Sequence, residues 1–143
     1  MKSILTRLAI DTTRDAELIN ITASVLAAVA ASGVTSGVAY VTTMHTTTGI
    51  TVNEGLPDVE SDLVSALERL APEIGDYRHQ RFLPSDGQMA VNSCSHQRSL
   101  LTGLQVAFPI DQGQMVTGSR QQIYFAEFDG PIRREYVIHV IGD

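Results

Sequence analysis

Apolar and polar positions alternate loosely from residue 3 to residue 10, and this period of two predicts a strand. The next apolar residues recur at helical spacing, at Leu18, Ile21, Val25, Ala28 and Val29. We therefore expect a helix over residues 17–31, with residues 11–13 (DTT) able to cap its start. Gly33 follows, and glycine readily takes the left-handed conformation in which many helices end. The many alanines of this segment predict close packing against a sheet.

A β-rich segment and a second helix follow. Residues 36–44 and 49–53 are rich in β-branched and aromatic side chains, which predicts two strands. The breaker residues 55–58 (GLPD) then start a helix that ends before Pro72. One face of this helix is apolar, at Val59, Leu63, Ala66, Leu67 and Leu70.

The remaining chain predicts one irregular stretch and several strands. Residues 73–94 show no clean period, and an irregular stretch of about 20 residues in a compact domain is more often functional than idle. Further strands are expected at residues 99–110, 115–118, 122–128 and 134–141, with turns at 111–114 and 129–131. Two helices among about seven strands predict a single α+β domain over residues 1–143, with a mostly antiparallel sheet or sandwich.

Composition narrows the class of protein. A chain of 143 residues with 43% hydrophobic and 18% charged residues is typical of one globular domain. The net charge of −6 without a basic cluster argues against a nucleic-acid partner, although a small anionic ligand needs only two or three arginines. Cys94 is the only cysteine, so no intrachain disulfide can form. This cysteine count, with no membrane-spanning run and no secretory pattern in the first residues, predicts a cytoplasmic protein.

The densest polar segment is residues 44–54 (MHTTTGITVNE). We expect it to meet residues 77–103 in space and to form one pocket with them. Three histidines lie in these stretches, His45, His79 and His96, and three imidazoles with one open position can hold a catalytic zinc ion. They are 34 and 17 residues apart, so their spacing adds little, and histidines scattered in this way are more often surface or hydrogen-bonding residues.

Other side chains offer acid–base and anion-binding chemistry. Glu54 can serve as a general base or orient a histidine, or it can be a solvated carboxylate before a turn. Arg98, Arg133 and Arg134 are candidate anion-binding groups, although the last two, beside a turn, are expected to face water. Cys94 is most simply a buried bystander.

Several ordered segments resemble one known family. Residues 45–54 are similar to its signature, which opens with His-Thr and closes with Asn-Glu. Residues 77–79 match its Tyr-x-His step, and Asn92 with residues 95–103 matches its Asn, His and Gly run. Residues 118–123 (GSRQQI) and 127–134 (EFDGPIRR) match its last two motifs. Nearly the whole chain thus resembles the YjbQ-like proteins, also called secondary thiamine-phosphate synthases.

The resemblance implies an α+β fold that forms a homotrimer with pockets near the subunit interfaces. It also implies a divalent metal ion, zinc, on His45, His79 and His96, with magnesium accompanying a diphosphate substrate. The associated activity is a weak thiamine-phosphate synthesis, which joins a pyrimidine diphosphate to a thiazole phosphate and releases pyrophosphate. Residues that bind substrate are then Thr47, Asn53, Arg120 and Gln121, and the catalytic residues are Glu54 and Arg98.

Two departures from the family pattern concern the substrate. Arg120 stands where the family has tryptophan, and Arg98 stands where it has lysine. Two alternatives to the synthase stay open, a metal-dependent hydrolase and a non-catalytic trimeric protein that binds a small anionic or phosphorylated metabolite. In a third alternative the histidines are incidental and the polar stretches shape a subunit contact.

Overall fold

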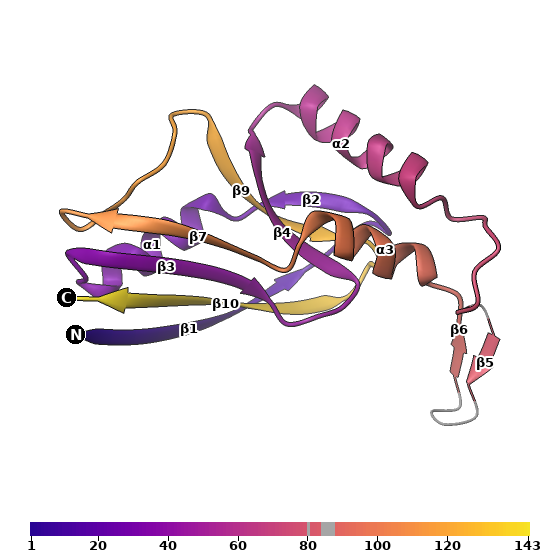
Figure 1. Ribbon diagram of the computed structural model, residues 1–143, viewed down its shortest axis with the longest axis horizontal. Helices are drawn as coiled ribbons and strands as arrows, with labels where there is room; N and C mark the ends of the chain where they lie inside the picture. The colour runs from indigo at the N-terminus through magenta and orange to yellow at the C-terminus, as the bar shows by residue number, and fades with distance from the viewer. Residues whose placement is uncertain (80, 84–87) are drawn as a thin grey trace.

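Two antiparallel sheets form the body of the protein, and we describe them from a computed structural model that covers residues 1–79, 81–83 and 88–143. The larger sheet has the order β1 (Lys2–Asp11), β10 (Arg133–Gly142), β3 (Ser36–Thr43), β7 (Gln105–Asp111) and β8 (Gln114–Met115). The smaller sheet has the order β2 (Glu17–Asn20), β9 (Gln121–Glu127) and β4 (Thr48–Glu54). A short hairpin pairs β5 (Arg81–Leu83) with β6 (Gln88–Ala90) beside the body (Figure 1). The predicted α+β domain with mostly antiparallel sheets is confirmed.

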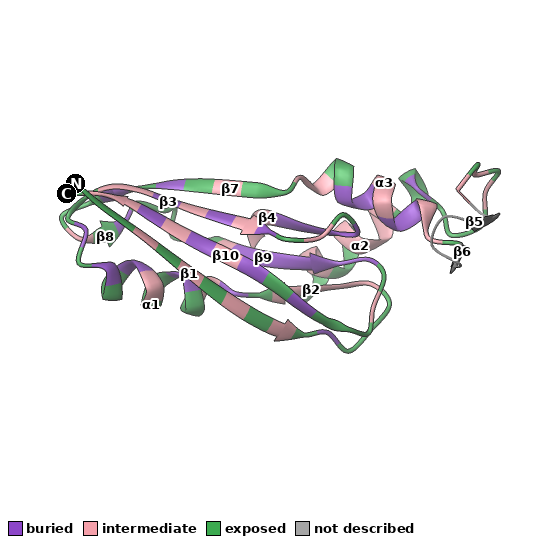
Figure 2. Ribbon diagram, turned by 90° about the horizontal axis from the view of Figure 1, so that it is seen from below, coloured by how far each residue is buried: buried purple, intermediate pink, exposed green. Residues whose placement is uncertain are grey.

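Alternating side chains of the large sheet build the core. Along β10, Tyr136, Ile138 and Val140 are buried while the residues between them are more exposed, as the period of two requires (Figure 2). The other core side chains come from β3, from the smaller sheet and from α1 (Thr22–Ser32), and include Val41, Phe125 and Val25. The two sheets therefore share one core, and α1 closes one end of it.

The first helix is shorter than predicted. Residues 17–20 pair with β9 as a strand, and α1 begins only at Thr22, where the Asn20 side chain accepts a hydrogen bond of 3.0 Å from the Thr22 amide. The predicted helix end is confirmed, because Gly33 has φ 61° in the left-handed region. Residues 11–13 do not cap the helix; the Thr12 hydroxyl is buried against the Glu127 carboxylate instead.

The region after the second helix differs most from expectation. The helix itself, α2 (Pro57–Leu70), has the predicted bounds but no buried residue, and it lies along the outside of the body (Figure 1). The first residues of the predicted strand 99–110 belong instead to a third helix, α3 (Ser93–Thr102). Residues 80 and 84–87 of the predicted irregular stretch lie outside the described residues. None of the helices described is both long and apolar enough to cross a membrane.

Candidate functional site

The loop between β3 and β4, residues 44–47, is held from several sides. Arg134 donates from Nη2 to the Thr47 hydroxyl at 3.0 Å, and the Phe128 amide donates to the Thr47 carbonyl at 3.2 Å. The Glu135 amide donates to His45 Nε2 at 2.9 Å. Thr47, which we expected to bind substrate, is buried and already engaged by the arginine. The hydrogen bonds to Thr47 therefore hold the loop in place.

A buried ion pair anchors this loop to β9 and β10. Arg134 donates to both oxygens of Glu127, from Nε and Nη2, at 2.8 Å each. Thr12 and the amides of Phe128 and Asp129 also donate to Glu127, at 2.9 to 3.1 Å. Burial alone raises the pKa of Glu127, but these hydrogen bonds and the charge of Arg134 outweigh it and lower the pKa. The carboxylate therefore stays ionised, and the expectation that Arg134 faces water is wrong.

Two of the three candidate histidines lie together. The Thr46 carbonyl can only accept, so His96 must donate from Nδ1 in the 3.1 Å hydrogen bond between them. In the neutral ring this leaves the His96 Nε2 lone pair free. The His79 ring lies edge-on to the His96 ring, with centroids 5.3 Å apart. This contact joins the irregular stretch to α3.

His45 has a different environment. Because its Nε2 accepts the Glu135 amide, the neutral ring carries its proton on Nδ1 and offers no free lone pair. Burial, followed by the charge of Arg134, lowers the pKa of His45 against the opposing charges of Glu127 and Glu135. Over residues 1–79, 81–83 and 88–143, no three His, Cys, Asp or Glu side chains are arranged to hold a metal ion. His79 and His96 thus contact each other, whereas His45 is hydrogen-bonded to the backbone of β10.

A second group of predicted residues lies at the other end of β4. Asn53 and Glu54 line an open cavity of about 440 Å³ with Arg120 and Gln121, and Arg120 forms an ion pair with Glu54. Thr48 and Glu54 are six positions apart in an extended strand, which is a distance of about 20 Å. Glu54 therefore lies far along β4 from the loop that carries His45, and the single pocket that we expected is divided within this chain.

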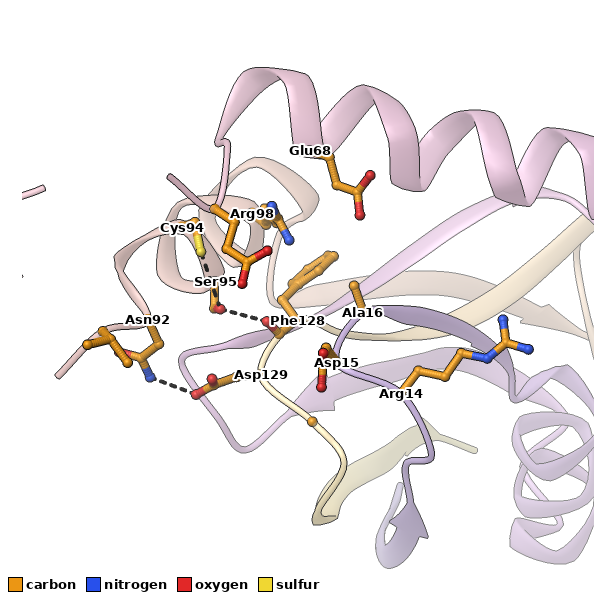
Figure 3. A pocket seen from close by; sticks show the side chains of 13 residues that line it. Arg14, Asp15, Ala16, Glu68, Asn92, Cys94, Ser95, Arg98, Phe128 and Asp129 are labelled. Carbon is orange, nitrogen blue, oxygen red and sulfur yellow. Dashed lines mark hydrogen bonds between the residues drawn. The ribbon is translucent and has the colours of Figure 1, made fainter. Parts of the chain in front are cut away.

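Arg98 lies neither with the histidines nor with the group at Glu54. Its side chain is buried under the end of α2, where Nε donates to the Ala71 carbonyl at 3.0 Å. Successive residues of an α-helix are rotated by about 100°, so Arg98 and His96 point to opposite faces of α3. Figure 3 shows Arg98 facing a cavity that it shares with Cys94 and Asn92.

Sequence reasoning did not predict how side chains fasten α3 to the sheets. The Ser95 hydroxyl donates to the Phe128 carbonyl, and the Ser99 hydroxyl donates to the Thr48 carbonyl, both at 2.6 Å. It also gave Glu127, the first residue of the last family motif, no buried role, although a carboxylate inside the apolar run IYFAEF of residues 123–128 was an available signal. A buried charge in such a run requires a partner, and the partner is Arg134.

The fold places this chain in the class of single-domain α+β proteins built on two antiparallel sheets. The profile of the family described as "UPF0047 protein YjbQ-like" matches residues 6–143. A UPF0047 protein of Methanocaldococcus jannaschii is 36% identical over 98% of this chain and 96% of its own length. YugU of Bacillus subtilis, also a UPF0047 protein, is 36% identical over 97% of this chain and 100% of its own length.

Solved structures agree with these sequence matches. A Clostridium acetobutylicum protein of the YjbQ/UPF0047 family is 38% identical, covers 95% of this chain and 99% of its own, and superimposes with a TM-score of 0.85. A Sulfolobus solfataricus protein at 24% identity covers 99% of both chains and shares the fold with a TM-score of 0.92. The chain belongs to the YjbQ-like family.

Proposed function

We propose that this protein is a metal-dependent enzyme that acts on a phosphorylated small molecule, with thiamine-phosphate synthesis as the reaction to test first. The observation that carries the proposal is the pair His79 and His96. The Thr46 carbonyl orients the His96 ring, and an oriented imidazole with one free nitrogen is the usual form of a metal ligand.

The donor set fits zinc in part. Imidazole nitrogen is a good zinc ligand, and the lowered pKa of His45 keeps that ring neutral. His79 and His96 are adjacent, whereas His45 must release the Glu135 amide before it can offer a lone pair. When bound there, zinc supplies a Lewis acid for a phosphate oxygen, and magnesium would travel with a diphosphate substrate.

Substrate binding and proton transfer are assigned to the second group of residues, and they require assembly of several subunits. Arg120, with Asn53 and Gln121, binds the anionic part of the substrate, and Glu54 moves or holds a proton. Because Glu54 lies about 20 Å along β4 from the loop, it can reach the histidines only of another subunit. We therefore include a homotrimer in the proposal, with Glu54 of one subunit serving the histidines of its neighbour.

Metal analysis tests the first part of the proposal. The protein is purified without a metal-binding tag, and zinc per chain is measured by mass spectrometry. We expect about one equivalent in the parent and a loss in each of His45→Ala, His79→Ala and His96→Ala. His139→Ala is the matched control, because His139 lies on β10 and contacts Ser3 at 2.9 Å. A parent that holds no zinc even after zinc is added overturns the metal site.

Pyrophosphate release from the pyrimidine diphosphate and the thiazole phosphate tests the reaction. We expect release by the parent and a loss of at least about tenfold in Glu54→Gln, which removes the charge but keeps the size. Zinc binding without pyrophosphate release excludes the synthase and directs the assay to hydrolysis of phosphate esters.

The distance between the two groups favours one alternative, a non-catalytic protein that binds a small anionic metabolite. The cavity at Glu54 and Arg120 carries a donor and an acceptor and needs no metal ion. This alternative predicts ligand binding that persists in His96→Ala and no product under any condition. Turnover that disappears in Glu54→Gln excludes it.

A further inference from the structure

A second cavity, on the opposite face of α3 from His96, carries the further inference. It has a volume of about 450 Å³ and lies between the end of α2, the first turn of α3 and the loop at residues 14–16. Cavities of this size hold small ligands. None of the residues proposed to bind the metal ion lines it, so its occupancy does not depend on that ion.

Arg98 is a buried cation that faces this cavity. Its side chain is only 7% exposed, and Nε donates to the Ala71 carbonyl. Among the described residues this is the one hydrogen bond that the guanidinium makes, and it joins none of the ion pairs. Figure 3 shows the terminal nitrogens directed into the cavity below α2. A buried guanidinium with free donors is suited to a phosphate or a carboxylate.

The first turn of α3 favours the same kind of group. This turn carries no acidic residue, and Asn92 at its start directs its side chain to the Asp129 carboxylate instead of capping the helix. The positive end of the helix dipole is therefore not compensated by a side chain of the turn itself. Cys94 and Ser95 of this turn line the cavity.

Carboxylates surround the cation at a distance. Glu68, Glu73, Asp15 and Asp129 line the cavity, and Figure 3 shows Glu68 pointing from α2 into the same space as Arg98. Arg14 also lines it, but Figure 3 shows its guanidinium directed away from Arg98. An anion that carries no positive group is attracted by Arg98 but repelled by these four carboxylates. A ligand that carries both an anionic group and an amino group satisfies both.

We propose that this cavity binds a small zwitterion. The phosphate or carboxylate of the ligand lies on Arg98, and its ammonium group lies against the carboxylates of Glu68 and Glu73. The proposed ligands are therefore small molecules that carry two opposite charges a few bonds apart. The inference stands without the proposed metal ion, and it adds a role for Arg98 outside the histidine group.

Calorimetric titration with phosphoethanolamine, a small phosphate zwitterion, tests the proposal, and inorganic phosphate and ethanolamine serve as its two halves. We expect phosphoethanolamine to bind at least about tenfold more tightly than either half. Arg98→Gln should abolish binding of phosphoethanolamine and of phosphate. Glu68→Gln with Glu73→Gln should weaken phosphoethanolamine while leaving phosphate unchanged or tighter. Asp62→Asn, on α2 but outside the cavity, is the matched control.

The outcomes separate this proposal from the metal site. Glu68 and Glu73 are exposed, so their variants keep the proposal testable even if Arg98→Gln fails to fold. The proposal is overturned if phosphoethanolamine binds no more tightly than phosphate. It is also overturned if the affinity for phosphoethanolamine is unchanged when Glu68 and Glu73 are replaced by glutamine. Binding should persist in His79→Ala and His96→Ala. If those variants lose zinc and keep phosphoethanolamine, both proposals stand; if the parent holds no zinc yet binds phosphoethanolamine, only this one does.

Discussion

Arg133 and Arg134 are neighbours in the sequence with opposite environments. Arg133 makes an exposed pair with Asp11 at 3.2 Å, and its side chain is 68% exposed. Arg134 is buried and donates to both oxygens of Glu127. Successive residues of a strand point to opposite faces, so β10 sends one arginine to water and the next to the interior. The two positions therefore test what burial does to an ion pair.

We predict that Arg134→Met lowers the free energy of unfolding by about 3–5 kcal/mol, because it leaves the Glu127 carboxylate buried without its partner. Arg133→Ala should change it by no more than about 1 kcal/mol, since exposed pairs contribute little. Urea unfolding of the two variants and the parent measures both values. Equal effects at the two positions would show that the buried pair is not what anchors the loop.

His45 makes stability depend on pH. In the unfolded chain its pKa is about 6.5, whereas burial and the charge of Arg134 lower the pKa in the folded protein. As pH falls below about 6.5, the unfolded chain takes up a proton that the folded protein still excludes, so stability decreases. We predict that the unfolding free energy falls less between about pH 7 and pH 5.5 in His45→Gln than in the parent. Urea unfolding at both pH values measures this, and identical changes in the two proteins would contradict it.

The candidate site shows how far residue types alone can lead. The sequence pointed to His79 and His96 as chemically interesting, and they do lie together. It wrongly placed Glu54 in the same pocket as these histidines. Glu54 and His45 belong to one motif, and residues close in the sequence were assumed to be close in space. In an extended strand, however, two residues that are six positions apart lie about 20 Å from each other. Thr46 and Thr48 accept hydrogen bonds from α3, whereas Glu54 forms its ion pair with Arg120.

At the scale of elements, long periodic segments were predicted well and short mixed ones were not. β1, β3, β4, β9, β10 and α2 lie close to their predicted positions. Residues 99–102 were predicted as the start of a strand, yet they end α3, and Leu100 and Leu101 are exposed, at 82% and 54%. Hydroxyl groups rather than apolar ones fix this helix to the sheets, through Ser95 and Ser99. Periodicity does not report such contacts.

The packing of α3 on β4 requires a glycine. A Cβ at Gly49 would lie 2.6 Å from Thr102 Cγ2 and 2.9 Å from the Gly103 carbonyl oxygen. We predict that Gly49→Ala lowers the free energy of unfolding by about 1–3 kcal/mol, because α3 must move away from the strand. The control is Gly118→Ala, whose Cβ meets the flexible Gln121 side chain at 3.4 Å and should have little effect. Urea unfolding compares the two, and a neutral Gly49→Ala would show that α3 is free to shift.

At the scale of the whole molecule, some exposed apolar side chains lie close to the proposed histidine site. Several lie on α3 and on the residues beside it, at Val91, Leu100, Leu101 and Leu104. A subunit contact along α3 would cover such side chains. In the proposed homotrimer, this contact would lie beside His96, at the site that two subunits share.

Mixing two inactive variants tests whether a site is shared between subunits. Glu54→Gln keeps its histidines and His96→Ala keeps its glutamate, and each alone should lack synthase activity. In a ring of subunits mixed equally by unfolding and refolding, a site is intact when its histidines come from one variant and its Glu54 from the other. Each condition is met in half of the cases, so we predict about one quarter of the parent activity. If all groups of a site came from one chain, mixing would restore nothing, because every subunit carries one defect.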